Sequence, residues 1–389
     1  MKKTFRRSSV FIALGAAVAI PAVSGIPAQI NNESSAKAAL VVPIHVFQTV
    51  PTDLLYVTGG AQRVAQFALN RLNAVATPAQ LTASSAGIEV DCPHAGKFLA
   101  RAAAPDTIAL TFTDCARETE GLVWDMTGVA EIVLSASSFA PNSVASIRLG
   151  NAEQDLLEKF YSVETPESYS LWSRNLRVVG RIPVERDEPD FGYYGPFTYN
   201  VTGFSEQAHT THAPDGTAGK FGLRYASENL VVNGHRNEWW LGNVQVFDFV
   251  FNFTSGNLSQ TFFDTLAAVS ETRTDTFDAL KVSHRVVSQG NNNIASLSID
   301  GAVDITWRAG HGAGCVSGTY VMHTPQPLVF INDTGSYAPD DGELRINDNL
   351  VARFSAVPQT TIRVNVRNVG NFRYHESITA VAASVPCAP

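Results

Sequence analysis

The stretch Ala295-Ser-Leu-Ser-Ile-Asp-Gly-Ala-Val-Asp-Ile-Thr-Trp307 decides the fold class of this chain. Apolar and polar residues alternate along it, and the apolar set is Leu297, Ile299, Val303, Ile305 and Trp307. Only a strand, whose side chains point to opposite faces at every second residue, turns such alternation into one buried and one solvated surface. Asp300-Gly301 is also compatible with a tight hairpin turn, so the stretch predicts either one strand or two.

The same alternation continues toward the C-terminus. It recurs at Val316–Met322, Leu344–Ile346, Leu350–Phe354 and Ile362–Val366. Successive segments of this kind, separated by polar turns, are typical of an antiparallel meander with one face in the core. The predicted fold class is therefore mainly β, as a curved sheet or a two-layer β architecture.

One amphipathic helix is predicted in the N-terminal part, packed on the sheet. After Gly59-Gly60, apolar residues recur at helical spacing from Ala61 to Leu72, and Pro78 ends the pattern. The residues before it, 40–58, are predicted to form an extended lead-in, in which the apolar residues are Val41, Val42, Ile44, Val46 and Phe47. A short polar helix is predicted at Ala152–Tyr161.

The N-terminus has the organisation of an export signal. Lys2, Lys3, Arg6 and Arg7 precede an apolar run from Val10 to Ile20, which is too short to span a bilayer as a helix. Cleavage is expected near Gly25 or after Ala36–Ala39, and the later site gives a signal peptide of residues 1–39. Arg6-Arg7 also fits a twin-arginine signal. No later apolar stretch predicts a membrane span, so we expect an exported protein in the periplasm, on the cell surface or secreted.

Length and charge limit the domain count and the partners. The chain has 389 residues and a net charge of -8, with 45% hydrophobic residues and no basic stripe, so a globular protein is predicted and nucleic acid is excluded as a partner. Acidic residues, Pro and Gly cluster between Asp187 and Pro196. This segment predicts a boundary between residues 40–186 and 187–389, or an exposed segment within one continuous domain.

The cysteines are Cys92, Cys115, Cys315 and Cys387, an even number that fits an exported protein with disulfides. Four cysteines allow three pairings, and pairing between sequence neighbours is favoured. Cys92 and Cys115 flank Gly96–Phe112, which predicts a hairpin, and Cys315 would then bind Cys387. The alternative, a reactive Cys315 thiol near His311, requires an unpaired cysteine.

Two groups of aromatic residues are the candidate ligand contacts. Phe247, Phe249, Phe251 and Phe253 occupy every second position and form one strand face, which lines either the core or an apolar cavity. Trp239 and Trp240 are adjacent, so in a strand they point to opposite faces, and one of them is available to stack on a sugar ring.

No metal or cofactor is predicted. His209, His212 and Asp215 have the side chains of metal ligands, but residues 206–219 are expected to form a loop, without the fixed frame that a zinc site needs. Residues 340–349 are rich in Asp and Asn but lack the ligand spacing of a helical calcium loop, and such residues are common in turns between strands.

Several stretches resemble segments of uncharacterised secreted β-rich proteins of Gram-negative bacteria. They are Cys92-Pro-His-Ala-Gly-Lys-Phe98, Leu110-Thr-Phe-Thr-Asp-Cys115, Gly128–Leu134, Ile299–Ile305, Gly318–Leu328 and Gly342–Ile346. The resemblance rests on glycine and strand spacing. It implies an exported antiparallel sheet and no particular activity.

Catalytic signatures of serine hydrolases, zinc proteases and phosphate-binding loops are missing from the sequence. The leading hypothesis is therefore an exported, non-enzymatic β-sheet protein with a structural or binding role and an unknown partner. One alternative is a periplasmic carrier of a lipid or other apolar ligand. Another is a secreted hydrolase acting on glycans or esters, because paired carboxylates meet only in the fold.

Overall fold

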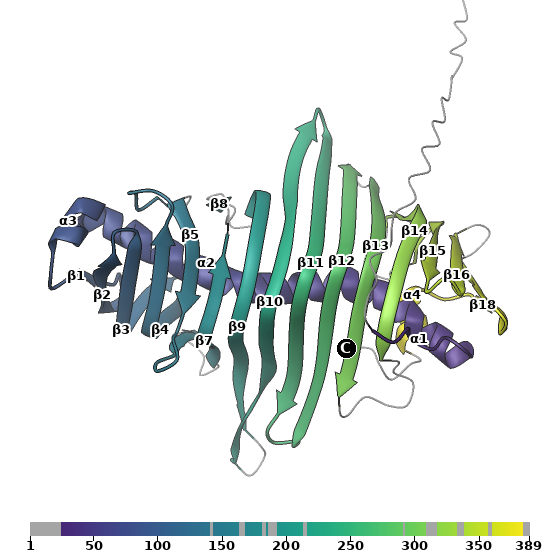
Figure 1. The fold of residues 1–389 in the computed structure, drawn as a ribbon, viewed down its shortest axis with the longest axis horizontal. Helices are drawn as coiled ribbons and strands as arrows, with labels where there is room; N and C mark the ends of the chain where they lie inside the picture. The colour runs from purple at the N-terminus through teal and green to yellow at the C-terminus, as the bar shows by residue number, and fades with distance from the viewer. Residues whose placement is uncertain are drawn as a thin grey trace, which may run out of the picture.

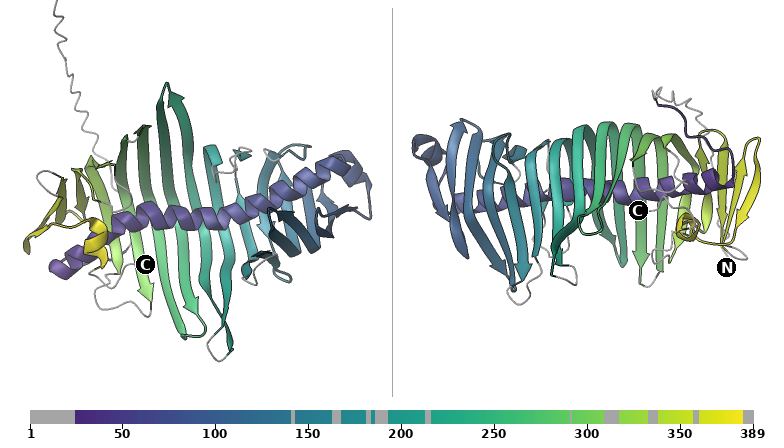
Figure 2. Two further views of the ribbon diagram at one scale, coloured as in Figure 1. Left: turned by 180° about the vertical axis from the view of Figure 1, so that it is seen from behind. Right: turned by 90° about the horizontal axis from the view of Figure 1, so that it is seen from below.

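A long helix lies along the inside of one curved antiparallel sheet (Figures 1 and 2). The computed structural model describes residues 25–140, 143–162, 168–180, 184–185, 193–212, 216–290, 292–308, 317–332, 338–356 and 360–383. The strands cross the helix and arch over it, so that the sheet forms a trough with the helix inside (Figure 2). The fold is mainly β, as predicted.

The helical run begins at α1 (Glu33–Ile44), passes through a π-helical turn η1 (His45–Thr49) and continues as α2 (Val50–Val75). Asn32 caps its N-terminus, where its side chain accepts a hydrogen bond from the Ser35 backbone N–H. The 43 residues span about 65 Å at 1.5 Å per residue. Two short helices, α3 (Pro78–Ala83) and α4 (Ile378–Ala383), complete the helical part of the described chain.

The helical run corrects the expectation for residues 40–58. Residues 40–58 are helical, so the predicted extended lead-in is wrong. Apolar residues surround the helix on nearly all sides, and burial in the trough outweighs the low helix propensity of valine and the prolines Pro43 and Pro51. By length and composition the run is also able to cross a membrane, although 75% of its most apolar window is buried inside the protein.

The strands follow the chain order. They are β1 (Ile88–Asp91), β2 (Ala95–Ala104), β3 (Thr107–Thr119), β4 (Leu122–Leu134), β5 (Val144–Leu149), β6 (Leu156–Ser162), β7 (Ser168–Val179), β8 (Val184–Glu185), β9 (Tyr193–His212), β10 (Ala218–Leu241), β11 (Val244–Asp264), β12 (Val269–Gln289), β13 (Asn292–Arg308), β14 (Gly318–Ile331), β15 (Asp341–Ile346), β16 (Leu350–Ser355), β17 (Thr361–Val366) and β18 (Gly370–Tyr374). From β9 to β18 each strand pairs antiparallel with the next, which confirms the meander.

The N-terminal half of the sheet departs from this order at two places. β7 pairs directly with β9, and the two-residue strand β8 pairs with residues 193–194 of β9. β5 and β6 share one position between β4 and β7: β6 pairs with residues 122–128 of β4, and β5 pairs with residues 130–134. Residues 156–162 are therefore a strand, so the predicted helix at 152–161 is wrong. Asp300-Gly301 lies inside β13, so the hairpin alternative is wrong as well.

A line of irregular residues crosses the sheet near the middle of the strands. Asn229 of β10 and Ala279 of β12 adopt positive φ, and the register shifts beside them. A glycine of the next strand lies against the backbone carbonyl oxygen of each residue. A Cβ added to Gly256 would lie 2.2 Å from the Asn229 oxygen, and a Cβ added to Gly301 would lie 2.2 Å from the Ala279 oxygen. Similar close approaches occur at Gly96, Gly128, Gly203 and Gly342. Because bulges bend and twist a strand, this bulge line curves the sheet around the helix.

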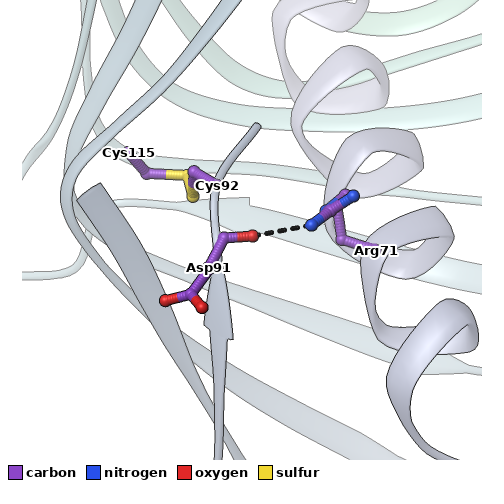
Figure 3. Close-up of a disulfide and its surroundings, with 4 residues drawn as sticks. All are labelled: Arg71, Asp91, Cys92 and Cys115. Atoms are coloured by element: carbon purple, nitrogen blue, oxygen red, sulfur yellow. Dashed lines mark hydrogen bonds between the residues drawn. A yellow bond between two sulfur atoms is a disulfide. The ribbon is translucent and has the colours of Figure 1, made fainter. Parts of the chain in front are cut away.

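A disulfide closes the N-terminal end of the sheet. Cys92 and Cys115 are bonded with their Cα atoms 5.4 Å apart, as predicted, and β2 and β3 form the hairpin between them. Beside the disulfide, the Arg71 guanidinium donates a hydrogen bond to the Asp91 carbonyl oxygen, which ties α2 to β1 (Figure 3). Such a disulfide contributes roughly 2–4 kcal/mol by restricting the unfolded chain. Cys315 and Cys387, the second predicted disulfide pair, lie outside the described residues. So do residues 186–192, which make up most of the predicted domain boundary.

Candidate functional site

The phenylalanine stripe of β11 faces the helix. Phe253 is fully buried, and Phe251 packs against the same core. Phe249 contacts His284 of β12 at a ring distance of 6.1 Å, and Phe47 of η1 contacts the same imidazole at 4.6 Å. The stripe is therefore part of the interface between the sheet and the helix.

The tryptophan pair lies at the end of the β10–β11 hairpin. Trp240 is largely exposed, and Arg285 lies over the Trp239 ring at 5.8 Å from its centroid. Because the two residues are neighbours in a strand, their side chains occupy opposite faces of the hairpin. Trp240 pairs with Gln245 and therefore lies on the same hairpin face as the stripe, whereas Trp239 lies on the other face.

The most unusual chemistry of the described chain is a buried ionic cluster between helix and sheet, which we name the ionic latch. It comprises His45 of η1, Asp53 of α2 and Arg273 and Asp275 of β12, and each is almost completely buried. Arg273 donates to Asp275 at 3.0 Å and to Asp53 at 2.9 Å. Gln260 of β11 donates to the second oxygen of Asp53 at 2.9 Å.

The proton positions in the ionic latch follow from burial and charge. Burial, then the Arg273 charge, lowers the pKa of His45, and the His45 Nε2 atom forms a hydrogen bond with Asp275 at 3.0 Å. Burial acts to raise the pKa of Asp275, but His45 and Arg273 outweigh it and the pKa is lowered. Burial raises the pKa of Asp53 to about 7 despite the Arg273 charge. The latch therefore holds one Arg273–Asp275 ion pair and an Asp53 carboxyl that gains a proton near neutral pH.

The π-helical turn brings His45 and Asp53 onto one helix face. Eight residues of α-helix rotate about 800°, which would leave the two side chains about 80° apart. One extra residue in a π turn reduces this offset to about 20°. The Val50 backbone N–H donates to the His45 carbonyl, five residues earlier, and this bond defines the wider turn. The irregular turn thus positions both helix members of the ionic latch.

A second buried carboxylate holds the other part of the helix. Glu158 of β6 accepts hydrogen bonds from Arg63 of α2 at 3.1 Å and from the Trp124 indole at 2.9 Å. Burial raises the pKa of Glu158, and the Arg63 charge opposes this shift. Arg63 also lies over the Trp124 and Phe160 rings. The Arg63–Glu158 contact therefore fixes the helix to the sheet at a second point, between the ionic latch and the Arg71–Asp91 hydrogen bond.

Sequence patterns did not reveal these residues as a site. Arg273 and Asp275 are four and two residues before buried Phe277 in the same strand, so their side chains lie on the same, inward face. This spacing is the local signal in the sequence that the two charges are buried. Their partners on the helix lie more than 200 positions away, as the separation of 220 between Asp53 and Arg273 shows.

The described side chains among the candidate metal ligands take part in strand packing, hydrogen bonds and ion pairs. Residues 206–212 belong to β9, so the predicted loop is wrong there, and the His209 ring packs between Tyr169 and Phe221. Asp215 lies outside the described residues. Asn347 accepts from the Val321 backbone N–H, and Glu343 binds Arg345 and Arg353. Within the described ranges, no group of three His, Cys, Asp or Glu side chains is arranged to hold a metal ion.

The buried His284 imidazole is expected to make the stability of the helix–sheet interface depend on pH. Burial among Phe47 and Phe249 lowers its pKa from 6.5 to about 4, so unfolding takes up a proton between these values. A base with a lowered folded-state pKa contributes stability above pH 6.5 and loses it as the pH falls toward 4. The loss is on the order of 2 kcal/mol after partial solvation is allowed for.

His284→Phe is expected to reduce this acid-induced loss. Urea unfolding at pH 7 and pH 4.5 measures it for both proteins. His235→Phe is the control, because His235 binds Asp248 on the opposite sheet face and its replacement leaves the contribution of His284 in place. An identical fall in unfolding free energy for wild type and His284→Phe would contradict the assignment.

No protein-family model matches the chain, and a search of curated proteins found no match. The class of protein is therefore defined by the fold and its buried contacts alone: a mainly antiparallel β trough with an internal helix.

Proposed function

We propose that this chain is an exported, non-enzymatic structural and binding protein that contacts its partners with its outer surface. The observation that carries the proposal is the filling of the trough. Buried residues of the helix, from Ala36 to Leu72, and the inward residues of the sheet form one continuous core. The place where a hollow β protein would hold a ligand is occupied by the chain itself.

The helix surface supports the same proposal. Between Val50 and Leu72, the more accessible positions of the described side chains form one polar or glycine stripe: Thr52, Gly59, Arg63, Gln66, Asn70 and Arg71. An apolar ligand inside the trough would have to displace the helix from its core and break both the ionic latch and the Arg63–Glu158 contact. Separating buried charge pairs leaves uncompensated charges, so such a displacement is costly.

Export is supported by the N-terminal residues together with the contacts of the segment after them. Ala28 donates its backbone N–H to Thr319 of β14, and Asn349 donates its side-chain amide to the Ile30 carbonyl. Ala36 and Ala39 are fully buried. Cleavage near Gly25 keeps these contacts, whereas the later site preferred from the sequence would remove the N-cap and the residues of α1 from Glu33 to Ala39, about two turns of the helix. We therefore propose the earlier site.

Native mass spectrometry of the chain purified gently from its own host tests the proposal. We expect the mass of a mature polypeptide that begins near Gly25, with no stoichiometric ligand, and no turnover of ester or glycan substrates above the blank. A tightly held lipid at one copy per chain would support the carrier instead, and turnover above the blank would support a hydrolase. Finding the tagged protein only in the cytoplasm would overturn the export part.

A further inference from the structure

The hairpin ends at one rim of the central strands form an uncharged band. We define the tip band as residues 239–246 of the β10–β11 hairpin and the described residues 287–290 and 292–294 of the β12–β13 hairpin. It contains no Asp, Glu, Lys, Arg or His. The two hairpins align row by row, because Val244, Gln245 and Val246 pair with Gln289, Ser288 and Val287.

The tip band exposes large apolar side chains on both faces of the hairpin. Trp240 and Leu241 are each 62% exposed, and Ile294 is 48% exposed. Trp240 and Leu241 are consecutive, so they point to opposite faces. A protein partner that docks on a sheet face covers one of these side chains and leaves the other in water. A medium that surrounds the hairpin end covers both.

The depth of the uncharged zone matches an interfacial insertion. Three cross-strand rows at about 3.4 Å each give a charge-free layer about 10 Å deep. Glu238 begins the next row, and Asp248 and Arg285 follow. For comparison, amphipathic helices that lie in a membrane interface bury their apolar face to a depth of about 5–10 Å. Pairing with β9 stops at Arg236, so the end of β10 projects beyond its neighbour.

The opposite ends of the same strands provide an internal comparison. Phe221 and Phe262 are 39% and 42% exposed there, which is apolar exposure of a similar kind. Asp264 pairs with Phe221 in the row next to the β11–β12 turn, Glu271 pairs with Phe262, and Lys220 is adjacent. Charged side chains thus reach the end of that rim. Desolvation in a lipid interface is costly for them and not for the tip band.

We propose that the tip band inserts into the interface of a lipid bilayer, with Trp240 and Leu241 as the inserted side chains. Tryptophan favours this interface because its ring is apolar and its N–H remains available to polar groups. The net charge of -8 gives no general attraction to anionic lipid, so the apolar contact drives binding. This inference deepens the proposed function, on which it rests, by naming a lipid surface as the partner.

Vesicle flotation of the purified full-length mature chain tests the proposal. We expect the wild type to float with phosphatidylcholine vesicles at both low and high salt. Brominated phosphatidylcholine is expected to quench part of its tryptophan fluorescence. Trp240→Ser combined with Leu241→Ser should lower the partition coefficient roughly tenfold or more and remove the quenching. Phe221→Ser combined with Phe262→Ser is the matched control and should bind as the wild type does.

Circular dichroism and thermal unfolding establish that both double variants fold. The proposal is overturned if the wild type does not float, if both double variants lose binding equally, or if binding requires anionic lipid and disappears at high salt. It is also overturned if sedimentation shows that the tip band joins two copies of the chain and the vesicles bind nothing. A lipid retained at one copy per chain in the Trp240→Ser, Leu241→Ser variant would instead contradict the proposed function.

Discussion

Arg273→Met is expected to lower the free energy of unfolding by roughly 3–5 kcal/mol. Arg273 neutralises Asp275 and holds Asp53 within the ionic latch, and all three side chains are almost fully buried. Its removal leaves a carboxylate in the core without a countercharge. Urea unfolding of the purified variant at neutral pH measures the loss.

Arg224→Met is the matched control, because the same substitution on β10 removes an ion pair with Glu206 in which the Arg224 side chain is 42% exposed. Its expected loss is below about 1 kcal/mol. Adding Asp275→Asn to Arg273→Met should recover part of the loss, since the uncompensated charge is gone. Equal losses for Arg273→Met and Arg224→Met would show that the ionic latch contributes no more than a surface pair.

Gly301→Ala is expected to cost roughly 2–4 kcal/mol of unfolding free energy, and Gly256→Ala a similar amount. Both glycines have positive φ, and a Cβ at either position meets a backbone carbonyl oxygen at 2.2 Å. Since that oxygen belongs to the bulged residue of the neighbouring strand, the clash is relieved only if the strands separate at the bulge line. Thermal unfolding and urea unfolding measure the effect.

The control substitutions are Gly290→Ala and Gly242→Ala in the hairpin turns. Both positions have positive φ, but nothing lies within 4 Å of an added Cβ. The unfolding free energy of these two variants should therefore fall by only about 1 kcal/mol, because alanine adopts a positive φ less readily than glycine does. If the turn variants and the bulge-line variants lose the same free energy, close strand approach is not what the bulge-line glycines provide.

The sequence by itself determined the features that depend on neighbouring residues. Alternation from Leu297 to Trp307 predicted β13, and the flanking positions of Cys92 and Cys115 predicted their disulfide. Helical spacing from Ala61 to Leu72 located the C-terminal half of α2. These predictions succeed because strand and helix periods are properties of a few consecutive residues.

Only the tertiary structure decided the rest. Val41, Val46 and Pro51 favour an extended chain locally, but the trough buries that segment, and a helix satisfies its backbone hydrogen bonds there. The ionic latch joins residues of one helix to residues of β12 far along the chain, and the tip band exists because two separate hairpins end in the same rows. No local period carries that information, since both arise from contacts that form only when the sheet has curved around its helix.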